Sequence, residues 1–564
     1  MQMTPSSLRF GDVFPFPNYV DVRGSAGLIG VSADLQFNGP DNEILKGAFD
    51  RVVQNIKDDK FLPLEANSSV WANVAESASI KEVAFNVKSV DADLQHGVNE
   101  SYTLNIADEE RVAVTAETVW GALHALNTFE QLVLYQADKD RIFVEGPVSI
   151  VDEPRYPYRG LMIDTARNFY SVEALCRHVD ALAAAKMNVF HWHLSDTQAW
   201  PIYVKSHPQM TDDAYSSSEI YQPEDVEKLV EYARARGVRV IPELDLPGHS
   251  NSGWRRINKD IVACGDYDGP WSDVAGEPNP GQLDVANDTT YTVLKDVYND
   301  ISSMFTDQFF HVGGDELNSG CYNASKNIQK WLKEDSSRTL SDLVQQWIDK
   351  ALPIFKNRVG RKLVMWADIV LGSMPANHLS TEDVILQSWT GGIDNVKEAA
   401  SKGYDVIISS SDFLYLSCGM GGWNPGDPRL NVQQDPSPGQ TSVNYGGNGG
   451  APCAPFKSWQ RIYNFDWNSQ LSPEEQKHVV GGSAALWSEQ MDGYSADSIA
   501  WPRTASLGEL LWSGNKDSNG NLRIKDASRR LANFRERLIN RGVAAAPILP
   551  KYCAKNPGKC DYEG

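Results

Sequence analysis

The chain has 564 residues, a net charge of −22 at pH 7 and a sequence pI of about 4.9. A chain of this length exceeds one ordinary core, so at least two domains are expected. The acidity argues against nucleic acid as a partner, because phosphate binding needs a basic face. The sequence contains no run of 18 apolar residues, so neither a transmembrane helix nor a membrane partner is expected.

The first 150 residues predict a small α+β domain. Strand-like runs at Ala84–Val87 and Tyr102–Ile106 precede Ala116–Leu134, where apolar residues recur near helical spacing. A proline and charges interrupt the apolar pattern at Asp152-Glu153-Pro154. We therefore expect one domain over residues 1–152 and a second, catalytic one over residues 153–564, the latter ending in a helix and tail.

Apolar runs alternate with helical patterns from about residue 159 to residue 490. One helix is expected after the capping residue Ser171, and another from Pro223 to Gly237. The alternation predicts an α/β fold, a (β/α)₈ or TIM barrel, with an open doubly wound sheet as the alternative. The eight expected strands are Arg159–Asp164, Met187–Leu194, Val238–Glu243, Phe309–Val312, Lys362–Trp366, Val384–Trp389, Tyr404–Ser409 and Ser483–Trp487.

Polar and aromatic side chains gather at the carboxyl ends of these strands, where barrels of this type place their active sites. In the stretch His311-Val312-Gly313-Gly314-Asp315-Glu316, two adjacent carboxyl groups follow a strand that reads as buried. Like charges and burial raise the pKa of a carboxyl group, and an acid kept protonated near neutrality can donate a proton. The two glycines permit a sharp turn or a close approach to a ligand. Taken alone, the motif also fits a solvent-exposed acidic turn.

Seven cysteines indicate a disulfide framework. Cys176 lies on the apolar face of an expected helix and should remain a free thiol. Of the other six, two close a short tail loop and two bracket a Gly/Pro-rich segment, which leaves one pair by elimination. The expected disulfides are Cys553–Cys560, Cys418–Cys453 and Cys264–Cys321. Three disulfides favour an extracellular protein over a cytosolic one with reduced thiols.

Glycosylation acceptors point the same way. The Asn-x-Ser/Thr pattern occurs at Asn67, Asn99, Asn287 and Asn323. The segment Met1–Leu8 lacks the apolar region of a secretory signal, so we expect a secreted protein whose signal peptide is absent from this chain.

Several stretches resemble the β-N-acetylhexosaminidases of glycoside hydrolase family 20, fungal secreted type. They are Arg159–Arg167, His191–Asp196, Glu243–His249, His311–Glu316, Trp487–Glu489 and the tail Arg541–Pro547. The resemblance implies removal of terminal β-linked GlcNAc, and usually GalNAc, from chitooligosaccharides or glycoconjugates. It further implies retention of configuration by substrate-assisted catalysis through an oxazolinium intermediate, without cofactor or metal. Fungal relatives are often homodimers.

The resemblance also assigns roles to residues of this chain. Glu316 matches the general acid/base, Asp315 the group that holds the acetamido N–H, and Tyr415 the hydroxyl donor to the acetamido oxygen. Trp366, Trp389 and Trp487 resemble the aromatic box around the N-acetyl group, and ordinary barrel core is their alternative. Arg159 and Glu489 match residues that bind the outer hydroxyls of the sugar. Asp196, Asp245, His249 and His311 look like groups that orient the acidic pair.

One position departs from the family. Relatives usually read Tyr-Leu-Asp where this chain reads Tyr415-Leu416-Ser417, so a carboxylate expected near O4 and O6 of the sugar is missing. Either Glu489 and a water fill the gap, or the specificity at Ser417 is relaxed.

Two other functions fit parts of the sequence. His191 and His193 face the same side of a strand and could join His249, His311 and an aspartate in a metal-dependent amidohydrolase on the same barrel. A glycan-binding protein on an inactive barrel is the second, because fold alone does not imply catalysis.

Overall fold

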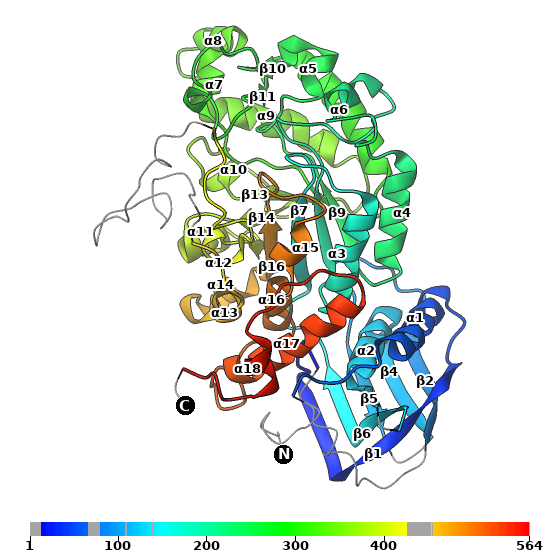
Figure 1. Ribbon diagram of the computed structural model, residues 1–564. Helices are drawn as coiled ribbons and strands as arrows, with labels where there is room; N and C mark the ends of the chain where they lie inside the picture. The colour runs from blue at the N-terminus through cyan, green and yellow to red at the C-terminus, as the bar shows by residue number, and fades with distance from the viewer. Residues whose placement is uncertain are drawn as a thin grey trace.

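The computed structural model describes residues 13–65, 79–107, 110–137, 139–425, 453 and 455–562. Figure 1 shows a helix-wrapped barrel with a smaller sheet domain packed at one end of it. The expected order, a small α+β domain followed by a TIM barrel, is confirmed.

The N-terminal domain is a six-stranded sheet with helices on one face. Its strand order is β1-β2-β4-β3-β6-β5, with an additional pairing of β1 and β6. Thr118 caps α2, because its hydroxyl accepts from the Gly121 N–H at 3.4 Å. The elements are β1 (Tyr19–Asn38), α1 (Glu43–Asp59), β2 (Ser79–Ser89), β3 (Tyr102–Ile106), β4 (Arg111–Thr118), α2 (Val119–Leu132), β5 (Leu134–Gln136) and β6 (Arg141–Asp152).

Eight parallel strands close the barrel. The last pairs with the first in register, from Gly481 opposite Tyr158 to Leu486 opposite Ile163, which excludes the open sheet. All eight expected strands are present: β7 (Tyr158–Asp164), β8 (Val189–His193), β9 (Arg239–Glu243), β12 (Phe309–His311), β13 (Lys362–Trp366), β14 (Val384–Ser388), β15 (Val406–Ile408) and β16 (Val479–Leu486). One buried apolar layer inside the barrel comprises Tyr158, Val189, Ile241, Phe309, Val364, Ile385 and Ile407.

Helices cover the outside of the barrel. Ser171 caps α3 and Pro223 begins α4, as expected. Gly237 follows α4 with φ of 73°, a conformation that favours glycine. The longer helices are α3 (Val172–Ala184), α4 (Pro223–Arg234), α6 (Asp288–Ser303), α8 (Lys326–Lys333), α9 (Leu340–Phe355), α11 (Gly392–Ser401), α16 (Arg503–Trp512) and α17 (Ile524–Asn540).

Short elements fill the loops. A two-stranded hairpin of β10 (Val262–Ala263) and β11 (Gln282–Leu283) was not expected from the sequence. The short helices are α5 (Trp254–Ile257), α7 (Ser319–Ala324), α10 (Asp368–Leu371), α12 (Ser411–Leu414), α13 (Trp459–Tyr463), α14 (Pro473–Lys477), α15 (Ala496–Ala500) and α18 (Lys551–Lys555).

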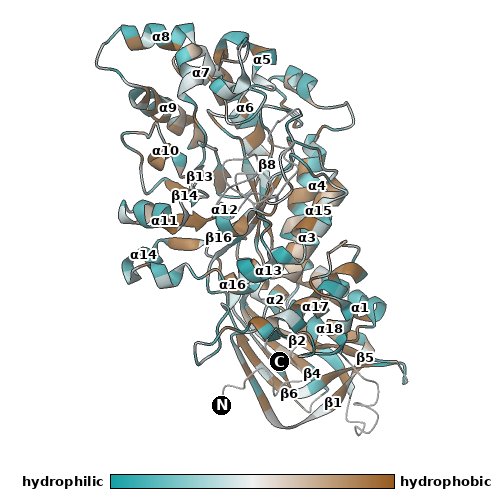
Figure 2. Cartoon of the chain, turned by 60° about the vertical axis from the view of Figure 1, so that its left-hand side comes forward, coloured by the Kyte–Doolittle hydropathy of each residue, from teal (hydrophilic) through white to brown (hydrophobic). Residues whose placement is uncertain are grey.

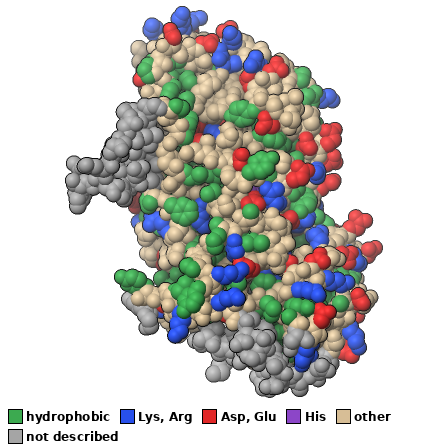
Figure 3. Space-filling model, viewed as in Figure 1, with side chains coloured by type: hydrophobic (Ala, Val, Ile, Leu, Met, Phe, Trp, Pro, Cys, Tyr) green, Lys and Arg blue, Asp and Glu red, His purple; other side chains and the backbone are tan. Residues whose placement is uncertain are grey.

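Hydropathy and charge follow this architecture. The barrel strands are largely apolar in Figure 2, whereas peripheral helices such as α14 are largely polar. Acidic side chains gather along the edge formed by α4, which exposes Glu224, Glu227 and Glu231 (Figure 3). Within the described ranges, no helix combines the length and apolar character needed to cross a membrane.

All three expected disulfides form, and Cys176 is a buried free thiol. Cys264–Cys321 ties the hairpin region to α7, and Cys418–Cys453 closes a loop between β15 and β16. Cys553–Cys560 closes the tail. Cys553–Cys560 was predictable from its short spacing, and Cys418–Cys453 from the Gly/Pro-rich segment that it closes.

Buried ion pairs join the two domains at the amino-terminal ends of the barrel strands. Arg159 of β7 pairs with Glu100, with Nη2–Oε1 at 2.6 Å and Nη1–Oε2 at 3.0 Å. Lys186, just before β8, places Nζ 2.8 Å from Oδ2 of Asp152, and both side chains are fully buried. The N-terminal domain therefore docks at this end, and the carboxyl ends of the strands are left for a site.

Candidate active site

A cavity of about 540 Å³ lies at the carboxyl ends of the barrel strands. Most of the expected site residues meet there: His249, Asp315, Glu316, Trp389, Tyr415, Ser417, Trp487 and Glu489 all line it. They come from loops after different strands, so the closure of the barrel is what brings them together.

The turn after β12 presents the two acidic residues. Gly313 and Gly314 have φ of 65° and 105°, and a Cβ on Gly313 would stand 2.0 Å from Oδ1 of Asp245. Glu316 and His249 also have positive φ, 49° and 44°, which is uncommon for residues with a side chain. Such strain persists only where the surroundings enforce it, and it concentrates at functional sites.

Glu316 ends a chain of alternating acids and imidazoles. His249 Nε2 lies 3.3 Å from its Oε2, and His249 Nδ1 lies 3.1 Å from Oδ1 of Asp196. Asp196 also contacts His193 Nε2 at 3.0 Å and Arg167 Nη1 at 2.7 Å. Burial alone would raise the pKa of Glu316, but its hydrogen bond and ion pair with His249 lower it.

Asp315 has the opposite electrostatics. Its side chain is buried, and Oδ1 makes no hydrogen bond within the described part of the chain. Burial raises the pKa of Asp315 well above its usual range, and the nearby Asp245 carboxyl adds to the effect. These opposite shifts favour the protonated form of Asp315 and the ionised form of Glu316 beside His249. The roles expected from the sequence require the opposite, a protonated Glu316 as general acid and an ionised Asp315 beside the acetamido group.

Aromatic rings form one wall of the cavity. Trp389 stacks with Tyr415 at 6.0 Å between ring centroids and 12° between planes, and Tyr415 lies 6.3 Å from Trp487. Trp389 is held by its indole N–H, which donates to Oδ2 of Asp368 at 2.6 Å. Trp366 is fully buried behind this wall, 6.0 Å from the Trp487 ring. Two of the three expected tryptophans thus line the cavity.

The expected role of Arg159 is wrong. Its guanidinium has no exposed surface and binds Glu100 at the opposite end of the barrel, so it cannot reach a ligand in this cavity. Arg167 lies there instead, between Asp196 and Glu277, with Nε donating to the Glu277 carboxylate at 2.9 Å. The signal was available in the sequence: Arg159 opens strand β7, whereas Arg167 follows its carboxyl end.

Glu489 shares this charged corner. Burial raises the pKa of Glu489 to about 7, with Arg167 opposing the shift and Glu277 adding to it. Glu277 was not expected from the sequence, nor were Trp271 and Trp423 at the mouth of the cavity. These residues lie on long loops, whose paths no local pattern of residues reveals.

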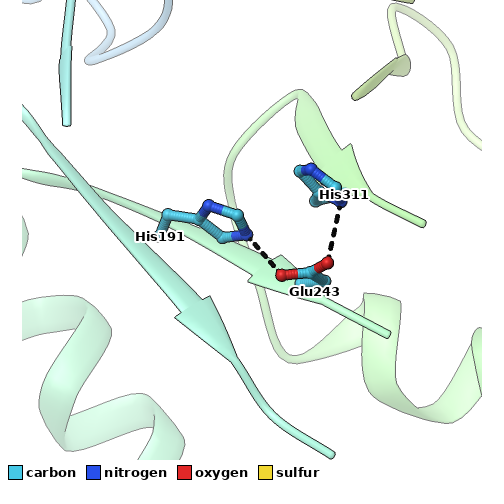
Figure 4. Close-up of side chains that lie close together, drawn as sticks. All are labelled: His191, Glu243 and His311. Atoms are coloured by element: carbon cyan, nitrogen blue, oxygen red, sulfur yellow. Dashed lines mark hydrogen bonds and ion pairs between the residues drawn. The ribbon is translucent and has the colours of Figure 1, made fainter. Parts of the chain in front are cut away.

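The structure also places the histidines of the metal hypothesis. His191 Nε2 and His193 Nδ1 each lie 2.8 Å from Oε2 of Glu243. His191, Glu243 and His311 have the residue types and spacing of a metal centre, with donor atoms within 4.8 Å of one another (Figure 4). Both Glu243 oxygens already accept N–H donors, however, since Trp366 Nε1 donates to Oε1 at 2.8 Å. The carboxylate is therefore fully hydrogen-bonded, whereas Nδ1 of His191 and Nε2 of His311 make no hydrogen bond among the described residues.

Comparison with known proteins decides the family. The model described as "Glycosyl hydrolase family 20, catalytic domain" matches residues 156–515, and "beta-acetyl hexosaminidase like" matches residues 13–132. The chain belongs to glycosyl hydrolase family 20. This membership makes it a glycosidase and confirms its resemblance to the fungal β-N-acetylhexosaminidases.

The relatives match over most of their length. Beta-hexosaminidase 1 of Coccidioides posadasii is 47% identical over 97% of this chain and 94% of its own. Beta-hexosaminidase of Emericella nidulans is 49% identical over 89% and 84%. Among solved structures, Flavobacterium johnsoniae chitobiase covers 98% of this chain and 75% of its own at 25% identity, with a TM-score of 0.73.

The two arginines can be separated by mutation. Arg159→Met leaves Glu100 without its main partner, so we expect a loss of about 3–5 kcal/mol in the free energy of unfolding. KM for a chromogenic GlcNAc glycoside should not change. Arg167→Lys should instead lower kcat/KM by roughly 10- to 100-fold, because lost charge-assisted hydrogen bonds cost ~1.5–3 kcal/mol. Denaturant unfolding and steady-state kinetics measure both, and a raised KM for Arg159→Met would contradict the correction.

Proposed function

We propose that this enzyme removes terminal β-linked GlcNAc, and also GalNAc, from chitooligosaccharides or glycoconjugates with retention of configuration. The nucleophile is the 2-acetamido oxygen of the substrate, which attacks C1 and forms an oxazolinium intermediate. The observation that carries the proposal is the meeting of Asp315, Glu316 and Tyr415 in one cavity with an aromatic wall.

Glu316 acts as the general acid and then as the general base. His249 holds a proton next to it, since Asp196 outweighs burial and raises the pKa of His249 well above its ordinary value. A sugar in the cavity excludes water around Glu316, which favours its neutral form. The proton shared across the 3.3 Å contact then moves from His249 to Glu316 and on to the leaving oxygen. In the second step Glu316 accepts a proton from the attacking water.

Asp315 and the aromatic wall handle the acetamido group. The amide N–H donates to Asp315, and the growing positive charge of the oxazolinium favours the carboxylate form of this residue. Tyr415 donates its hydroxyl to the acetamido oxygen. Trp389 and Trp487 hold the group against C1, so that the attack is close to a unimolecular step.

The rest of the cavity determines which glycan enters. Arg167 and Glu489 line the same cavity, and we assign to them the outer hydroxyls of a terminal sugar, which is the arrangement that exo action needs. Trp271, Trp423 and Met420 add apolar surface at the mouth, and Trp423 is 37% exposed. A second sugar can stack there, which favours oligosaccharides. A relative of Ostrinia furnacalis, 34% identical over 82% of this chain, is a "Chitooligosaccharidolytic beta-N-acetylglucosaminidase".

Secretion is part of the proposal. Three disulfides support an oxidising compartment. Of the glycosylation candidates, Asn99 and Asn323 are exposed, and Asn67 lies outside the described residues. Asn287 is poorly placed, because its Nδ2 donates to the Asp260 carbonyl and its Oδ1 caps α6. The homodimer remains a prediction.

Glu316→Gln should reduce kcat on chitobiose by roughly 10²- to 10⁴-fold, because the leaving oxygen loses its proton donor. Binding of the sugar should survive. A GlcNAc glycoside with a dinitrophenolate leaving group serves as the control, since that group departs without protonation and should lose far less rate. Near-normal turnover of chitobiose by the variant would remove Glu316 from the role of acid. Loss of turnover also discards a purely glycan-binding function for the parent.

The intermediate can be tested directly. A GlcNAc-thiazoline, which imitates the cyclised sugar, should inhibit far more strongly than GlcNAc, because the cavity is built for that species. Asp315→Asn should weaken this inhibition, since it removes the carboxylate beside the ring nitrogen. The contrary result is a covalently glycosylated carboxylate, detected by mass spectrometry after incubation with a 2-fluoro sugar.

Ser417 should make the enzyme more tolerant of a charged substituent at O6 of the sugar. It lines the cavity where relatives usually carry a carboxylate, which would repel a 6-sulfate. We expect the ratio of kcat/KM for GlcNAc-6-sulfate to that for GlcNAc to fall at least about tenfold in Ser417→Asp, because like charges can cost several kcal/mol. Ser417→Asn matches the shape without the charge and should keep the parent ratio. Equal ratios in all three proteins place Ser417 outside contact with the sugar.

A further inference from the structure

Glu243 is a buried carboxylate that no step of the proposed reaction uses. It is the last residue of β9, and its side chain is fully buried. Figure 4 shows it between the rings of His191 and His311, which come from β8 and β12. Its Oε2 accepts from His191 and His193 of β8. Its Oε1 accepts from the Trp366 indole of β13 and lies 3.2 Å from Nδ1 of His311 of β12. One carboxylate therefore joins four neighbouring strands directly under the cavity.

His193 is the partner that carries the compensating charge. Burial favours the neutral form of its ring, but Glu243 and Asp196 outweigh burial and raise the pKa of His193 well above its usual value. Both ring nitrogens lie within hydrogen-bonding distance of these carboxylates. Nδ1 is 2.8 Å from Glu243 Oε2, and Nε2 is 3.0 Å from Asp196 Oδ2. His193 is thus an imidazolium held between two carboxylates.

His311 does not share this charge. Burial lowers the pKa of His311 to about 3 and outweighs the opposing effect of Glu243, whose Oε1 lies 3.2 Å from His311 Nδ1. The same Nδ1 accepts from the Gly313 N–H at 3.1 Å. Its neutral ring packs against Trp366 at 4.9 Å between centroids. Because one imidazolium balances Glu243, the charge state of the cluster depends on His193.

The cluster continues to the catalytic acid. From Glu243 the contacts run through His193, Asp196 and His249 to Glu316, each between 2.8 and 3.3 Å. A second branch runs from Glu243 to Trp366, which backs the aromatic wall. The other charged groups facing this chain are Asp164 at the end of β7, Arg167 after it, Asp245 after β9, Glu277 beside Arg167, and Asp315 after β12.

We propose that Glu243 is a positioning residue that keeps His193 doubly protonated and Trp366 in place, and thereby sets the protonation of the His249–Glu316 pair. The inference rests on the proposed function, in which Glu316 is the general acid. A purely structural role, neutralising histidines in the core, predicts loss of stability without any change in the titration of the acid.

The direction in which Glu243→Gln shifts the pH profile follows from the charges around His193. Glu243→Gln removes the carboxylate that keeps His193 an imidazolium. Asp196 then faces one cation fewer and holds the proton of His249 more tightly, and a more persistent His249 cation lowers the pKa of Glu316 further. The proposed reaction draws its proton from the His249–Glu316 pair, and a His249 that holds this proton more tightly keeps the pair protonated to higher pH. The alkaline limb of the kcat/KM profile should therefore move to higher pH, while the plateau falls because transfer to Glu316 becomes less favourable.

The experiment compares pH profiles of kcat/KM on chitobiose for the parent, Glu243→Gln, His193→Gln and the double variant. We expect a loss of about 10- to 100-fold in each single variant, typical of groups that orient a reactive residue, and the same shift of the alkaline limb. The double variant should be no slower than the worse single one, because both act through one link. An unmoved limb, or losses that multiply, overturns the proposal.

Glu100→Gln is the matched control. It also removes a buried carboxylate from an arginine and a histidine, with His124 Nε2 at 2.8 Å, but at the other end of the barrel. It should lower the thermal midpoint and leave the pH profile unchanged. If Glu243→Gln does not fold, His193→Gln alone tests the link by the same shift. One equivalent of zinc in the parent, lost in Glu243→Gln together with activity, also overturns the proposal in favour of a metal centre.

Measurements on the parent enzyme separate a failure of the proposed function from a failure of the role assigned to Glu243. Its own turnover of chitobiose reports on the proposed function, whereas the difference between parent and variant profiles reports on Glu243. An active parent with an unshifted variant therefore removes the role of Glu243 and leaves the proposed function standing.

Discussion

A carboxylate taken out of water must find donors, and this requirement organises both ends of the barrel. At the amino-terminal ends of the strands, Glu100 and Asp152 of the N-terminal domain bind Arg159 and Lys186. At the carboxyl ends, Glu243 and Asp196 bind imidazoles and a guanidinium. A buried charge without a partner costs several kcal/mol, so each of these groups limits the position of the next.

The two ends use the same interaction for different purposes. At the amino-terminal ends of the strands, Glu100 pairs with Arg159 and Asp152 pairs with Lys186. These pairs fix how the N-terminal domain packs on the barrel. At the carboxyl ends, acids outnumber cations, and Asp315 and Asp245 are left with carboxylate oxygens that make no hydrogen bond among the described residues. Protonation of carboxyl groups can offset this excess of acids over cations. General acid catalysis needs such a group, one that can give up a proton.

Backbone strain concentrates where these groups act. Glu316 and His249 both adopt positive φ without being glycine, and they face each other across the 3.3 Å contact between Oε2 and Nε2. Gly313 lets the turn after β12 approach Asp245 more closely than any side chain would permit. The surrounding barrel is packed tightly enough to hold these conformations, so the acid is in place before a sugar enters.

Local patterns in the sequence determined the strands, their order, the helix caps at Ser171 and Pro223, and the acidic pair. These features depend on neighbours along the chain, through apolar periodicity, capping and the direction in which a strand ends. The disulfides of the tail and of the loop after β15 were predictable for the same reason. Family motifs then supplied most of the site, including Tyr415, Trp389, Trp487 and Glu489.

Tertiary structure alone decided the rest. The positions of Arg159 and Arg167 relative to β7 could be read from the sequence, but only the docked N-terminal domain shows that Arg159 is bound to Glu100. The depth of Trp366, the arrival of Glu277 and Trp423 on long loops, and the reversed proton affinities of Asp315 and Glu316 were equally hidden. Each depends on groups far apart in the sequence, because the pKa of a carboxyl group is set by the charges and solvent that the fold places around it.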